Sequence, residues 1–83
     1  MSALEQLEEL EKYIPRLRTR IAHQAMHVEG LADYHHIAKR AREILAQEME
    51  DLRRALIQVE QLRKQAAKEA ARRARDRDDS NVA

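Results

Sequence analysis

The chain has 83 residues, and its 16 Lys and Arg residues nearly balance its 15 Asp and Glu residues, for a formal net charge of +1. It contains one Gly, one Pro and no Cys, Trp or Phe. This excludes a fold of short strands and turns, Gly-rich phosphate-binding loops, disulfide frameworks and thiolate zinc sites. The composition predicts an all-α protein. At this length one core supplies only about 3–5 kcal/mol, so we expect self-association.

The first predicted helix runs from about residue 3 to residue 32. Ser2 and Glu5 form a capping-box pattern at its start. Its apolar residues recur at alternating spacings of three and four, which is typical of a helix face that packs on a neighbour. Because the pattern keeps its phase across Pro15, we expect one kinked helix rather than two short ones. The apolar stripe comprises Leu7, Leu10, Ile14, Leu17, Ile21, Val28 and Leu31.

A turn is predicted next, around residues 30–36. Gly30 can end the first helix in a left-handed conformation, and Asp33 can cap the second helix. The second helix is expected to begin between residues 34 and 37 and to carry an apolar face broad enough for a bundle. That face comprises Ile37, Ala38, Ala41, Ile44, Leu45, Met49, Leu52, Leu56, Val59 and Leu62.

Two architectures fit these helices. The favoured one is an antiparallel two-helix hairpin over residues 1–62, two copies of which share their apolar faces in a dimeric four-helix bundle. The alternative is a single coiled-coil helix about 110 Å long, because the heptad phase of the first helix continues into the second. The residues predicted to carry self-association are Leu7, Leu10, Ile14, Leu17, Ile21, Val28, Leu45, Met49, Leu52, Leu56, Val59 and Leu62.

Charge is arranged in blocks along the chain. The net charge is −3 over residues 1–15, +4 over 16–42, −3 over 43–62 and +5 over 63–77. Such blocks can set the pairing and register of helices, because facing like charges are penalised. The alternative interpretation is a plain solvated surface.

Residues 63–83 form a predicted basic, Ala-rich helical extension with a frayed acidic tail. Lys64, Lys68, Arg72 and Arg75 share one helical face, which Arg63, Arg73 and Arg77 broaden. Such a stripe can follow a phosphate backbone and so suggests nucleic-acid binding. No aromatic residue is interleaved for base stacking, and basic residues also suit a solvated helix end. The nucleic-acid candidates are Lys64, Lys68, Arg72, Arg73 and Arg75.

All four histidines lie within fourteen residues of each other. His23 and His27 are four apart on one helix, and a hairpin would bring His35 or His36 to the same end of the molecule. Imidazole groups so arranged can bind zinc or nickel, or gain charge below about pH 6.5. Exposed polar surface near a turn is the competing interpretation.

No catalytic residues are predicted, because none of the few hydroxyl groups has a motif that would supply a base and an oxyanion site. No cofactor is expected. No apolar run is long enough for a membrane span and no signal peptide is evident, which predicts a cytoplasmic protein. The expected function is that of a self-associating, protein-binding adaptor or regulator. The alternatives are a nucleic-acid-binding accessory protein and a metal- or pH-responsive histidine tip.

The stretch Arg20–Ile21–Ala22–His23–Gln24, followed by Val28, Leu31, Ala41, Ile44 and Leu45, resembles a pattern in short alphaproteobacterial proteins that have no assigned activity. The resemblance covers about residues 20–45. It implies a helical hairpin with its bend near residues 33–37, and it implies no function.

Overall fold

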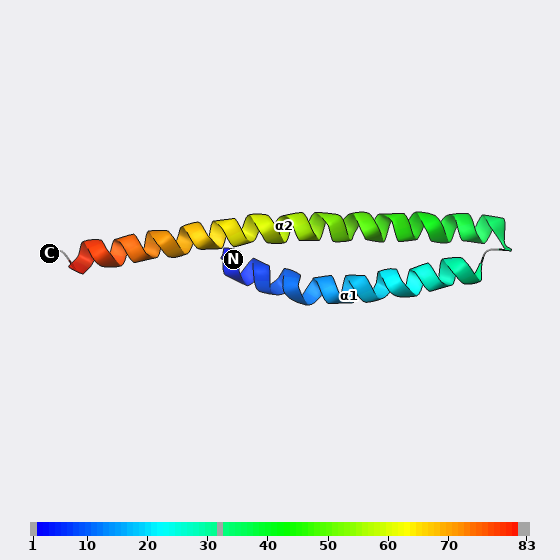
Figure 1. Cartoon of the computed structure of the whole chain (residues 1–83), viewed down its shortest axis with the longest axis horizontal. Coiled ribbons are helices and arrows are strands. Elements are labelled where there is room, and N and C mark those ends of the chain that lie inside the picture. Colours follow the sequence, from blue (N-terminus) through cyan, green and yellow to red (C-terminus); the bar gives the residue numbers. More distant parts are fainter. Residues whose placement is uncertain (1, 32, 82–83) are drawn as a thin grey trace.

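The computed structural model describes residues 2–31 and 33–81, and it is a hairpin of two antiparallel α-helices (Figure 1). Helix α1 spans Ala3–Gly30 and helix α2 spans His35–Asn81. The molecule measures 75 × 16 × 15 Å, with a radius of gyration of 20.4 Å, where a compact chain of this length would have about 12 Å. The predicted all-α hairpin is confirmed.

Helix α1 begins where the capping pattern predicts. The hydroxyl of Ser2 accepts a hydrogen bond from the backbone N–H of Glu5 at 3.2 Å, which satisfies one of the unpaired amides of the first turn. Pro15 lies inside α1 and does not end it, and Figure 1 shows α1 bowed along its length. The hydroxyl of Thr19 donates to the carbonyl of Pro15 at 3.0 Å.

The turn differs in detail from the prediction. Gly30 is still helical, and no described residue has a left-handed φ. Instead Leu31 caps α1, with its N–H bonded to the carbonyls of Val28 and Glu29, and the N–H of Tyr34 donates to the carbonyl of Leu31 at 2.9 Å. These bonds tighten the last turn and close the bend without a left-handed residue. Asp33 is not the helix cap, because α2 begins at His35 and the residue before it is Tyr34.

The core is one narrow seam between the two helices. On each helix a continuous series of less exposed residues follows a spacing of three and four, as in a two-stranded coiled coil. Among the described residues, eight hydrophobic ones are buried and four of these are Ala, so the seam buries little apolar area. The buried residues are Ala3, Leu7, Leu17, Ala38, Ala41, Ala55, Val59 and Leu62.

Gln24, the polar residue that interrupts the apolar stripe of α1, lies in this seam. Its side-chain amide donates to the backbone carbonyl of Ala41 at 3.3 Å across the two helices. At the other end of the hairpin, Leu7 packs in one cluster with Val59 and Leu62. The hydrogen bond from the half-buried amide of Gln24 helps to set the register of the two helices.

Helix α2 continues past the start of α1. Ala3 packs against the cluster that contains Leu62, and Ala66 lies at its edge. The rest of α2 therefore projects as a single helix, and Figure 1 shows it running on beyond the N-terminus of the chain. We call residues 67–81 the extension. Among the described residues, no helix is both long enough and apolar enough to cross a membrane.

Candidate functional site

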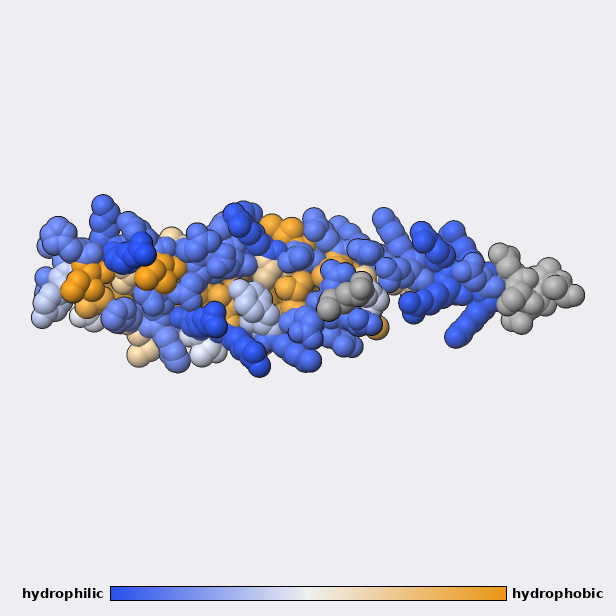
Figure 2. All heavy atoms as spheres, turned by 180° about the vertical axis from the view of Figure 1, so that it is seen from behind, coloured by the Kyte–Doolittle hydropathy of each residue, from blue (hydrophilic) through white to orange (hydrophobic). Residues whose placement is uncertain are grey.

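Large apolar side chains remain exposed on the flanks of the seam. On α2, Met49 and Leu56 are 56% and 42% exposed on one flank, while Ile37 and Ile44 are 56% and 42% exposed on the other. On the face drawn in Figure 2, apolar side chains reach the surface of the hairpin body between hydrophilic ones. Flank positions of this kind are where a further helix packs when coiled coils assemble into bundles. Other exposed large hydrophobic residues are Leu4, Tyr13, Met26, Tyr34 and Ile57.

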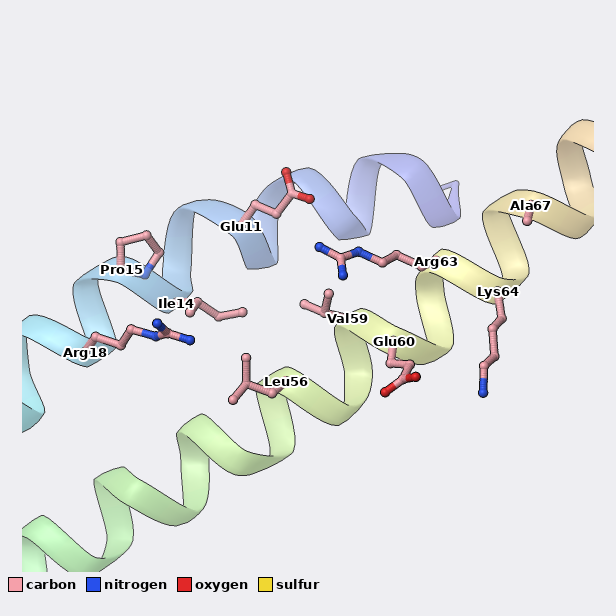
Figure 3. A pocket seen from close by; sticks show the side chains of 10 residues that line it. All are labelled: Glu11, Ile14, Pro15, Arg18, Leu56, Val59, Glu60, Arg63, Lys64 and Ala67. Atoms are coloured by element: carbon pink, nitrogen blue, oxygen red, sulfur yellow. The ribbon is translucent and has the colours of Figure 1, made fainter.

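A groove of about 690 Å³ runs along one flank, between α1 and α2, near the open end of the hairpin. Ile14 and Leu56 point toward each other from the two helices, and Glu11 and Arg18 stand on the α1 side of the groove (Figure 3). We call this the flank groove. Its lining residues are Glu11, Ile14, Pro15, Arg18, Leu56, Val59, Glu60, Arg63, Lys64 and Ala67.

Met49 extends the apolar part of this flank toward the bend. It precedes Leu56 by seven residues, so the two side chains lie on the same side of α2, two turns apart. The flank therefore has an apolar centre, formed by Met49, Leu56 and Ile14, with charged residues of both signs around it. An apolar centre with a polar rim is typical of protein–protein interfaces.

Most of the residues predicted to carry self-association serve the hairpin itself. Leu7, Leu17, Val59 and Leu62 are buried within the single chain, so they are not available to a second copy. The cause is the Ala residues of α2: Ala38, Ala41 and Ala55 occupy the seam and turn Met49 and Leu56 to the outside. The remaining predicted residues are half-buried at the seam, namely Leu10, Ile14, Ile21, Val28, Leu45 and Leu52.

Glu11 and Arg18 were not among the predicted site residues, and Pro15 was considered only for its effect on the course of the first helix. Their signal was present, because each residue directly follows a position of the apolar stripe of α1 and must therefore lie beside the seam. Which side of the seam would be hollowed, and whether α2 would supply apolar partners there, depended on the packing.

The four histidines are all exposed at the bend end of the hairpin. His27 and His36 line one hollow of about 420 Å³ together with Ile37 and Ile44, while His23 and His35 do not reach it. In the part of the chain that the structure describes, no three His, Cys, Asp or Glu side chains come together as a metal site. The hairpin thus gathers two histidines rather than a full ligand set.

The basic candidates lie beyond the hairpin body or at its end. Lys68, Arg72 and Arg75 border one surface hollow of the extension, and Arg73 lies on another side with Arg77. Lys64, Lys68, Arg72, Arg73 and Arg75 are all exposed. No ion pair between described residues engages them. Figure 2 shows the part of the extension that is coloured by hydropathy to be hydrophilic on the face that is drawn.

The ion pairs within the chain lie on the outer surface. Arg53 donates through Nε to a carboxylate oxygen of Glu50 at 3.0 Å and through its terminal nitrogen to the other oxygen, and Arg54 adds a contact at 3.4 Å. The hydrogen bond from Arg53 is the main reason why the pKa of Glu50 is lowered from its ordinary value. These pairs are solvated and support α2 locally, and they do not build a chemical site.

No protein family, curated protein or solved structure matches this chain.

Proposed function

We propose that the chain is a self-associating helical interaction module of the cytoplasm that acts by binding another protein, as an adaptor or regulator. The observation that carries the proposal is the exposure of Met49 and Leu56 beside the flank groove. The hairpin seam buries few large side chains, so a single hairpin lacks most of the apolar burial that stabilises a domain. Covering the flank with further helices supplies the missing burial.

Light scattering on the purified chain tests self-association directly. We expect a mass twice the 9.7 kDa of the chain, and we expect Met49→Glu combined with Leu56→Glu to give monomers, because charges at the apolar centre would have to be desolvated. The matched control is Ala46→Glu with Gln61→Glu, which adds the same charge at exposed positions of α2 away from the groove. A wild-type monomer, or a dimer that the first variant leaves intact, would contradict the proposal. Circular dichroism verifies that each variant is helical.

The exposed basic residues of the extension favour nucleic-acid binding as a second candidate function. The extension projects clear of α1, so a nucleic acid could reach its basic side without any rearrangement of the hairpin. Replacing Lys68, Arg72 and Arg75 with Gln should remove most affinity for a duplex, and wild-type affinity should fall by orders of magnitude from 50 to 200 mM salt. The control replaces Arg16, Arg20 and Lys39 with Gln in the hairpin body. Equal loss in both variants would indicate nonspecific charge attraction and exclude a dedicated interface.

A further inference from the structure

We propose that the flank groove binds a second copy of the chain in antiparallel orientation, with the bend of each hairpin directed toward the open end of the other. This inference rests on the proposed self-association and adds the face and the direction. Two observations carry it: the order of charges beside the groove, and the distribution of charge along the hairpin.

The first observation concerns Glu11 and Arg18. Both line the flank groove from α1, and they are seven residues apart, which is two turns or about 10 Å along the helix. No ion pair between described residues engages either of them. A two-fold axis that is perpendicular to the helices and passes midway between Glu11 and Arg18 places Glu11 of each copy opposite Arg18 of the other. A parallel dimer instead sets Glu11 against Glu11 and Arg18 against Arg18.

The second observation concerns the whole hairpin. Its open end, residues 2–15 and 50–62, carries seven acidic and three basic residues, whereas its bend end, residues 16–31 and 33–49, carries four acidic and six basic residues. An antiparallel pair brings the acidic end of each copy beside the basic end of the other. A parallel pair aligns like ends and also the strongly basic segment 63–77 of both copies, which is repulsive.

The apolar residues determine where the two copies meet. On α2, Leu56 faces Ile14 across the groove, and Met49 lies two turns further toward the bend. These apolar side chains therefore occupy the middle of the antiparallel interface. The charged pairs then lie at its rim, where they select the orientation while apolar burial provides most of the affinity.

Charge exchange at Glu11 and Arg18 tests the orientation. In the antiparallel dimer, Glu11→Arg or Arg18→Glu alone creates two like-charge contacts and should weaken dimerisation about tenfold, while the two changes together should restore it. In a parallel dimer each of these residues faces its own counterpart, so a single change only replaces one like-charge contact with another; dimerisation should then be nearly unchanged, and the double change has nothing to restore. The matched control is Glu9→Arg with Arg16→Glu, which has the same spacing and lies outside the groove.

A distance measurement gives an independent answer. The chain has no Cys, so Asp33→Cys accepts a single spin label at the bend. Two labels should be about 50 Å apart in the antiparallel dimer, because each bend lies some 18 residues from the axis, but only about 20 Å apart in a parallel one. Short distances, or a dimer without the rescue pattern, would overturn the orientation alone. A purified chain that stays monomeric would overturn the proposed self-association as well. This is the result expected if the groove binds a different protein instead of a second copy.

Discussion

Replacing Leu17 with Ala is expected to unfold most of the chain at room temperature. Leu17 is 2% exposed and is the one large side chain that is fully buried among the described residues. Its truncation should cost about 2–5 kcal/mol, as Leu→Ala changes in cores do. A core of this size supplies only about 3–5 kcal/mol in total, so the change removes most of the stability. The measurement is helical circular dichroism during thermal and urea unfolding.

The matched control for this experiment is Leu4→Ala. Leu4 is on the same helix but is 56% exposed, so its truncation leaves no cavity and should change the free energy of unfolding by about 0.5 kcal/mol or less. Both variants are compared at one chain concentration, since association contributes to apparent stability. Equal melting of Leu17→Ala and wild type would mean that the seam does not hold the hairpin together.

Replacing Pro15 with Ala is expected to stabilise the chain by about 1–3 kcal/mol. Helix α1 continues through Pro15, where the ring supplies no N–H for the carbonyl of Glu11 and crowds the preceding turn. Ala restores the hydrogen bond and has the highest helix propensity. Because Pro15 is exposed, the smaller side chain loses little packing. Chemical denaturation of both proteins at the same chain concentration measures the difference.

Arg16→Ala and Pro15→Gly serve as comparisons for this variant. Arg16 is exposed next to Pro15, and its replacement should be within about 0.5 kcal/mol of wild type. Gly restores the N–H but is less favourable than Ala by about 1 kcal/mol in a helix interior, so it should fall between Pro and Ala. A less stable Pro15→Ala variant would indicate that the bow of α1 around Pro15 is needed for packing against α2.

The sequence alone predicted the elements with good accuracy where side-chain chemistry is local. Ser2 determined the start of α1, and the continuous apolar stripe predicted that the helix would pass Pro15. The bend was placed correctly near residues 30–36, yet its mechanism was predicted wrongly, because Leu31 and Tyr34 close it through backbone bonds that any residue can make. Such bonds leave no signature in the sequence.

The composition determined that this protein is helical, because so few Gly and Pro residues permit little else. Only the tertiary structure decided which apolar residues the hairpin uses and which it leaves over. The apolar face of α2 is wider than one seam, and the sequence could not tell which edge would face α1. Close approach of the helices at Ala38, Ala41 and Ala55 decides this, and it leaves Met49 and Leu56 at the surface beside Glu11 and Arg18.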